Sequence, residues 1–275
     1  MLDSLQHICL MHGMEVDYYK KLFQTIGNIL DLIEKDDMPK YLLFLENAFP
    51  YMDNYNYHKG MKEIIQELKV LLKTKSIGTD SDRALLLDFQ AALETQPEKA
   101  IKLEKNALAQ IENITADNAR LVSNLHANLG GLYRMNGYPD LAREHMEKSI
   151  SLLDQFNLLH INDSIPQIAN YAMFLTEQQE PERGISELQK LSGIIKEYHS
   201  DECLDYAKVQ ENLATIYLMT ANLSQAKTHF KKAFKIYEKI LADEPEMIEA
   251  KYREIQELYP QIGFSIGKTL SGLLT

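Results

Sequence analysis

The sequence predicts an all-α fold, a right-handed α-α superhelix (solenoid) of about five helical hairpins closed by a C-terminal capping helix. Apolar residues recur at helical spacing, and Gly and Pro are scarce, with 12 and 8 among 275 residues. Small side chains return every 42 positions in two series, at 130, 172 and 214 and at 142, 184 and 226. Two helices of about 18 residues with short turns fill one such period, so each period is one hairpin.

The N-terminal part, residues 1–79, is predicted to form degenerate helical hairpins. Helices are expected over about 2–11, 16–34, 40–48 and 58–73, with Gly13 ending the first and Pro39 opening the third. Their apolar spacing is helical, but the 42-residue frame is not readable in them. Atypical terminal repeats are typical of solenoids, where they cap the stack.

Residues 80–242 contain the readable repeats, at about 81–114, 116–157, 164–198 and 201–241. Asp80 or Ser81 is expected to cap the first of these helices, and Thr115 to cap the second repeat. In the first repeat Ala100 and Ala107 keep the frame, whereas Asp88 and Glu104 break it. The third repeat opens near Ser164 and Pro166, and Pro181 opens its second helix. Residues 243–275 are predicted to cap the stack with a helix over 245–258 and an apolar tail over 262–274.

The repeated pattern resembles the tetratricopeptide repeat (TPR) family, in particular its long-repeat branch, to which kinesin light chain belongs. One occurrence comprises Leu129, Gly130, Tyr133, Gly137 and Ala142. A second comprises Leu213, Ala214, Tyr217, Ala226 and Phe230. The resemblance covers residues 81–241 and implies a protein-interaction fold whose concave groove is lined by the first helix of every hairpin.

In the family, the residue before the Leu-Gly or Leu-Ala pair faces the groove, and here it is Asn128, Asn170 and Asn212. Asn is somewhat unfavourable inside a helix, so its recurrence at one repeat position indicates that the side chain has a role there. A side-chain amide offers both a donor and an acceptor, which suits clamping the backbone of an extended peptide. The alternative is that each Asn bonds a neighbouring repeat and stiffens the stack.

Further residues are expected on the same surface. Lys208 lies one turn before Asn212 and resembles part of the carboxylate clamp of chaperone-tail TPR domains, but Asn124 and Pro166 stand where further basic residues would be needed. By helical phase, five more side chains project toward the groove: Met135, Met173, Glu177, Thr215 and Met219. A mixed polar and Met-bearing surface suits an adaptable peptide site, and ordinary helix surface is the alternative.

Charge and composition limit the classes of partner and the cellular compartment that we expect. The net charge of −11 argues against a nucleic-acid backbone and against an anionic membrane as the ligand. A basic stripe at 227, 231, 235 and 239 is expected to be a solvated face, with an acidic partner as the alternative. Cys9 and Cys203 give no disulfide framework, and neither a secretory signal nor an 18-residue apolar run is present, so a cytoplasmic protein is expected.

The sequence offers no starting point for catalysis. It has no HExxH, paired CxxC or nucleophile elbow, and His7, Cys9 and His12 do not share a helical face as metal ligands would. We therefore predict a non-catalytic module without metal or cofactor, which binds a peptide or helix of a partner protein. The alternative is a ligand- or peptide-sensing regulatory region of a bacterial transcription regulator or signalling protein.

Overall fold

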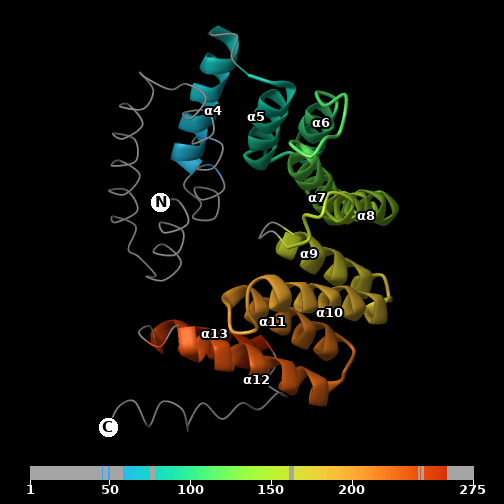
Figure 1. Ribbon diagram of the computed structural model, residues 1–275, viewed down its shortest axis with the longest axis vertical. Coiled ribbons are helices and arrows are strands. Elements are labelled where there is room, and N and C mark those ends of the chain that lie inside the picture. The colour runs from blue at the N-terminus through green and yellow to red at the C-terminus, as the bar shows by residue number, and fades with distance from the viewer. Residues whose placement is uncertain are drawn as a thin grey trace. The chain divides into compact units, whose positions relative to one another are not determined.

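The computed structural model describes residues 45, 49, 58–74, 78–160, 164–240, 242 and 245–258 (Figure 1). These residues form helices and turns without a strand in the ranges given. The helices are α4 (His58–Thr74), α5 (Asp80–Ala92), α6 (Pro97–Leu108), α7 (Ala119–Met135), α8 (Pro139–Gln155), α9 (Ser164–Glu177), α10 (Pro181–Tyr198), α11 (Leu204–Met219), α12 (Leu223–Ile240) and α13 (Pro245–Leu258). The helices expected over 2–11 and 16–34, most of the one over 40–48, and the tail over 262–274 lie outside the described residues.

The chain divides into two compact units, Met1–Leu158 and Leu159–Thr275. In the first unit α5 pairs with α6 and α7 with α8, and α6 also contacts α7. In the second unit α9 pairs with α10 and α11 with α12, while α10 contacts α11 and α12 contacts α13. Each predicted repeat is therefore one hairpin packed on the next within its unit, and the all-α repeat fold is confirmed.

Small residues stand where the two helices of a hairpin cross. A Cβ added at Gly130 would lie 2.6 Å from Met146 Cγ and 3.3 Å from the carbonyl oxygen of Ala142. A Cβ at Gly184 would lie 2.5 Å from the carbonyl oxygen of Ala172. The α7–α8 and α9–α10 crossings are thus as close as the 42-residue frame predicts.

The turns of the α7–α8, α9–α10 and α11–α12 hairpins share one backbone conformation. Gly137, Gln179 and Ala221, which stand 42 positions apart, have φ of +76°, +66° and +58°. The next backbone N–H donates to a carbonyl five residues back, from Tyr138 to Tyr133 at 3.0 Å, and the same bond recurs at 2.8 Å after position 179 and at 2.7 Å after position 221. A left-handed residue followed by this bond is how helices commonly end. It reverses the chain into the second helix.

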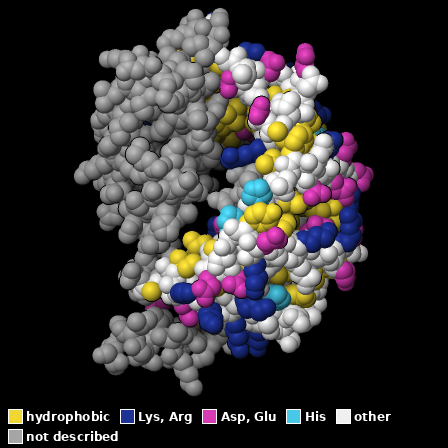
Figure 2. Space-filling model, viewed as in Figure 1, with side chains coloured by type: hydrophobic (Ala, Val, Ile, Leu, Met, Phe, Trp, Pro, Cys, Tyr) yellow, Lys and Arg dark blue, Asp and Glu magenta, His cyan; other side chains and the backbone are white. Residues whose placement is uncertain are grey.

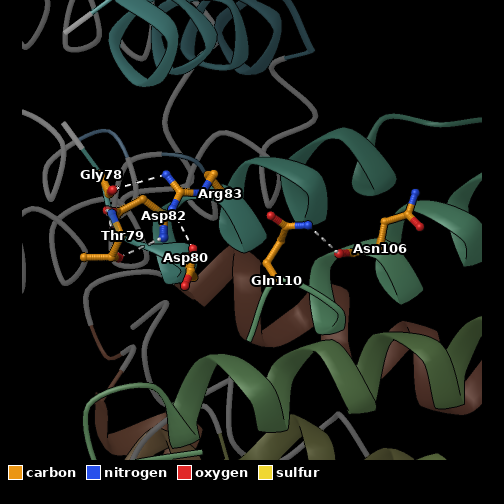
Figure 3. Close-up of polar contacts among 7 residues, drawn as sticks. All are labelled: Gly78, Thr79, Asp80, Asp82, Arg83, Asn106 and Gln110. Carbon is orange, nitrogen blue, oxygen red and sulfur yellow. Dashed lines mark hydrogen bonds and ion pairs between the residues drawn. The ribbon is translucent and has the colours of Figure 1, made fainter. Parts of the chain in front are cut away.

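The first cap of the repeat region differs from the prediction. Thr79, and neither Asp80 nor Ser81, is the N-cap of α5. Its Oγ1 accepts from the backbone N–H of Asp82 at 3.3 Å, and the Asp82 carboxylate accepts from the backbone N–H of Thr79 (Figure 3). The prediction was wrong because this reciprocal capping box needs a carboxylate three residues after the cap, and only Thr79 has one that closes it. Arg83 adds a bond to the Gly78 carbonyl at 3.3 Å.

The cap expected at Thr115 is also wrong. Helix α7 begins at Ala119, and its N-cap residue is Asn118. The Asn118 side chain accepts from the backbone N–H of Thr115 at 2.8 Å and donates to the Asn113 carbonyl at 2.9 Å. Thr115 therefore opens a turn before the helix, and the Asn118 side chain closes it. At the preceding helix end, Gln110 donates back to the Asn106 carbonyl at 3.4 Å (Figure 3).

The predicted helix over 245–258 is confirmed as α13, and it covers the apolar face of α12. The ring of Tyr252 stacks on Phe234 with centroids 3.9 Å apart, and its hydroxyl donates to Glu238 at 2.8 Å. Ile248 and Ile255 are buried in the same cluster. The helix thus removes apolar surface of the last hairpin from water, as expected of a cap.

Candidate functional site

The repeat frame places the three predicted asparagines at the same position of three first helices. Asn128 lies in α7 and is exposed, Asn170 lies in α9 and is exposed, and Asn212 lies in α11 and is half-buried. Helices α9 and α11 contact each other directly within the second unit. Asn170 and Asn212 therefore stand at equivalent points of two neighbouring helices.

The three side chains differ in their bonding. Asn128 Nδ2 donates to Asp88 Oδ1 at 2.8 Å, which ties α7 to α5 of the preceding hairpin. For this residue the structure contains the inter-repeat bond that the sequence left as an alternative. The structure records no side-chain hydrogen bond of Asn170 or Asn212 to another described residue. The frame alone did not reveal this difference, because it depends on an Asp in the neighbouring repeat.

The other predicted residues of α11 have local partners. Lys208 Nζ lies 3.6 Å from Asp205 Oδ1 across one turn. Thr215 Oγ1 donates to the Glu211 carbonyl at 3.0 Å. An ion pair of this exposed kind contributes little stability and is readily exchanged for another anion. Lys208 is thus an exposed cation whose present partner lies in its own helix.

The three methionines are unequally exposed. Met135 at the end of α7 is 76% exposed and Met219 at the end of α11 is 48% exposed, whereas Met173 in α9 is half-buried. Glu177, at the corresponding end of α9, is exposed. Flexible thioethers on an open surface adapt to varied apolar contacts. The surface around Asn170 and Asn212 therefore combines amides, a cation and a mobile apolar side chain.

Beneath Asn128 lies a buried acid that the sequence marked only as a break in the frame. Glu104 of α6 is 2% exposed and belongs to the same cluster as Asp88 and Asn128. Burial, followed by the negative charge and the hydrogen bond of Asp88, raises the pKa of Glu104 to about 10, and a hydrogen bond from Asn128 opposes the rise. Glu104 is therefore protonated at neutral pH and Asp88 carries the negative charge.

A histidine pair that sequence analysis did not single out joins α7 to α8. His126 Nδ1 and His145 Nδ1 are 2.9 Å apart, and the two rings line a surface pocket of about 510 Å³ with Glu144, Glu147 and Lys148. Burial is the first cause that lowers the pKa of His126, to about 4, and it also lowers that of His145. Both imidazoles are therefore neutral at pH 7.

A similar arrangement recurs 84 positions later, in α11 and α12. This spacing is twice the 42-residue period, which is the signal in the sequence that could have revealed it. His229 Nδ1 lies 2.8 Å from Gln210 Oε1, and its ring stacks on Tyr217 at 5.3 Å between centroids. In the first unit His145 lies against Tyr133 at 5.4 Å. A histidine therefore links the two helices in two hairpins, α7–α8 and α11–α12. Among the described residues no group of three or more metal-ligating side chains is present, and His7, Cys9 and His12 lie outside them.

The basic stripe of α12 is exposed, and Figure 2 shows dark blue side chains gathered over this helix. Lys239 pairs with Glu202, and the only acidic residue in α12, Glu238, accepts from Tyr252. No helix of the described chain has the length and apolar character needed to span a bilayer.

The fold and the repeated surface define a protein built from stacked helical hairpins. Comparison with known families matches residues 164–239 to the tetratricopeptide repeat, which bears out the predicted resemblance over this segment. The match spans the third and fourth repeats. No curated protein matches the sequence at a significant level.

Solved structures share the fold at low sequence identity. A Podosopora anserina protein described as a kinesin light chain with nearly identical TPR-like repeats has a TM-score of 0.54 and 15% identity, covering 73% of this chain and 97% of its own. The apo form of RapI gives 0.54 and 14%, with coverages of 86% and 67%. A Rap protein in complex with Competence and Sporulation Factor gives 0.53 and 15%, with coverages of 95% and 74%. The likeness to kinesin light chain repeats is thereby confirmed for the fold.

Proposed function

We propose that the protein is a non-catalytic protein-interaction module that holds an extended peptide or a helix of a partner protein along α9 and α11. The observation that carries this proposal is the placement of Asn170 and Asn212 at equivalent positions of two contacting helices, both accessible and neither hydrogen-bonded to another described side chain. The tetratricopeptide repeat is a protein-interaction fold, which supports the same conclusion.

The spacing of the two amides suits a peptide backbone. Packed helix axes lie about 8–10 Å apart. An extended chain advances about 3.3 Å per residue, so backbone groups about three residues apart would meet successive asparagines. Each amide would use its N–H₂ on a carbonyl and its oxygen on an N–H group. Met173, Thr215 and Met219 would contact the side chains of the ligand, and Lys208 would take an acidic one.

Within the first unit, taken by itself, Asn128 and Met135 would offer contacts of the same kind. The Asn128 amide is engaged with Asp88, so its carbonyl oxygen is the part offered to a ligand. The same proposal gives Glu177 the role of an exposed acidic contact at the end of α9.

We propose a cytoplasmic location, and partners that are proteins rather than nucleic acid or membrane, because the net charge is −11 and the sequence has only two cysteines.

The test uses an immobilised pool of acetylated nonapeptides and compares the wild type with the Asn170→Ala/Asn212→Ala double variant. Loss of two backbone contacts should weaken retention about five- to 100-fold, since two hydrogen bonds together contribute about 1–3 kcal/mol. Asn106→Ala on the second helix of another hairpin is the matched control and should retain peptides normally. Equal retention by the double variant and the wild type would rule out this site.

A second candidate is a regulatory sensor region, favoured by one observation. The Rap protein in complex with Competence and Sporulation Factor aligns with 95% of this chain. A sensor would change the pitch of its superhelix when ligand binds, whereas a scaffold would keep it. Small-angle scattering with and without a retained peptide distinguishes the two, because an unchanged profile argues for the scaffold. Whether the open reading frame continues into a helix-turn-helix or ATPase domain is the second check.

A further inference from the structure

The first readable repeat departs from the frame at two facing positions. Where later repeats have the small residues 130, 172 and 214, it has Asp88. Where they have Met146, Leu188 and Phe230, it has Glu104. Two acids thus replace a small residue and a large apolar residue at one helix crossing, while Ala100 and Ala107 on the same helix keep the frame.

This substitution has a cost that the surrounding structure does not offset. Glu104 is 2% exposed, and its Oε2 has no hydrogen-bond partner among the described residues. A buried polar atom without a partner destabilises the fold, whereas a Met or Leu would fill the position without that cost. Such departures are typical of functional sites. Once Glu104 is ionised, Oε2 is an acceptor, so the partner that it lacks is then a hydrogen-bond donor.

Two of the three members of the cluster are accessible to solvent. Asp88 is half-buried and Asn128 is exposed, and these two residues lie on α5 and α7, the first helices of contacting hairpins. Asn128 Nδ2 holds Asp88 Oδ1 at 2.8 Å, so its Oδ1 is left as an acceptor. Two neighbouring carboxyl groups match the donors of an ammonium or guanidinium group.

We propose that Asp88 and Glu104 form the receptor for a cationic side chain, Lys or Arg, of a polypeptide bound by the first unit. This inference rests on the proposed function. When the cation enters, the carboxyl proton of Glu104 leaves to solvent and the cation takes its place. The buried charge therefore stays at −1, because Asp88 and Glu104 together then carry −2 against +1. Asn128 positions Asp88 and completes the cage. Binding is thus coupled to the release of one proton.

The test uses four immobilised pools of acetylated, amidated nonapeptides whose central residue is Lys, Arg, norleucine or Glu. Norleucine has the shape of Lys without its charge. We expect the wild type to retain the Lys and Arg pools about tenfold more strongly than the norleucine pool, since close charge pairs at interfaces contribute about 1.5 kcal/mol or more. Glu104→Gln keeps the shape of the side chain but cannot become anionic, so the preference should vanish. Asp88→Asn is the second variant, in case the first does not fold.

Calorimetry on a retained Lys peptide, in phosphate and in Tris buffer, gives the second measurement. The heats should differ by the ionisation enthalpy of one proton for the wild type and should coincide for Glu104→Gln. A preference for basic peptides that survives in both variants, or a wild type that binds all four pools equally, would overturn the receptor and leave the proposed function standing. If no pool is retained at all, the proposed function itself fails.

Discussion

Two hairpin turns have a left-handed residue at the same repeat position, Gly in one turn and Ala in the other. Exchanging these two residue types tests the energetic cost of the left-handed backbone. Gly137 and Ala221 occupy the same frame position with φ of +76° and +58°. Glycine adopts this conformation without strain, whereas an L-residue with a Cβ costs about 1–2 kcal/mol. An added Cβ at Gly137 meets no atom within 4 Å, and Ala221 is exposed, so packing does not enter the comparison. Substitutions at these two positions therefore report the free-energy cost of the left-handed backbone without a contribution from packing.

We predict that Ala221→Gly stabilises the protein and Gly137→Ala destabilises it. Replacing Ala by Gly removes about 1–2 kcal/mol of strain from the folded state. It also costs about 0.4–1 kcal/mol, because the unfolded chain becomes more flexible. The free energy of unfolding should therefore change by about 0.5–1 kcal/mol, in opposite directions for the two variants. Urea unfolding followed by circular dichroism measures this as a shift of the midpoint at constant slope. Gln179→Gly, with φ of +66°, should behave like Ala221→Gly.

The double variant Gly137→Ala/Ala221→Gly is the control, because its two effects lie in different units and should cancel. A loss of stability in Ala221→Gly would refute the reasoning, since it would mean that the Ala methyl contributes more than the left-handed backbone costs.

Three further predictions follow from the contacts. Gly184→Ala should destabilise by about 1–3 kcal/mol, because its Cβ would lie 2.5 Å from the Ala172 carbonyl, whereas Gly193→Ala in the same helix meets no atom within 4 Å and should be neutral or stabilising in thermal unfolding. The wild type should lose stability as the pH falls from 6.5 toward 4. The pKa of folded His126 is lowered to about 4, so over this range the unfolded state binds a proton that the folded state does not bind. His126→Gln, which reproduces the Gln–His contact of the fourth repeat, should lose less stability over the same range. Glu104 contributes a trend of the opposite sign, because its raised pKa of about 10 makes the wild type lose stability as the pH rises above 4.5. Glu104→Met should remove this trend, and a variant whose urea midpoint declined as much as that of the wild type from pH 6 to 9 would contradict the assignment.

Local chemistry explains which parts of the structure were predictable. The 42-residue recurrence of small residues requires close helix crossings wherever it occurs, and Gly130 and Gly184 are at such crossings. Proline at the first helical turn likewise fixed the start of α8 and α10 at Pro139 and Pro181 in the structure, and the second of these was expected. The caps at Thr79 and Asn118 were misplaced, because several polar residues in a turn can cap and only the folded turn selects one.

The candidate surface was predicted only as far as position in the helix determines it. The sequence placed Asn128, Asn170 and Asn212 in phase, since helical period and repeat length are both local properties. Tertiary structure decided that Asn128 bonds Asp88 while Asn170 and Asn212 have no such partner among the described residues, because that depends on which residue a different repeat brings within 3 Å. The buried Glu104 and the His126–His145 tie were likewise decided by packing, since burial and pairing between helices are properties of the folded chain that no single helix contains.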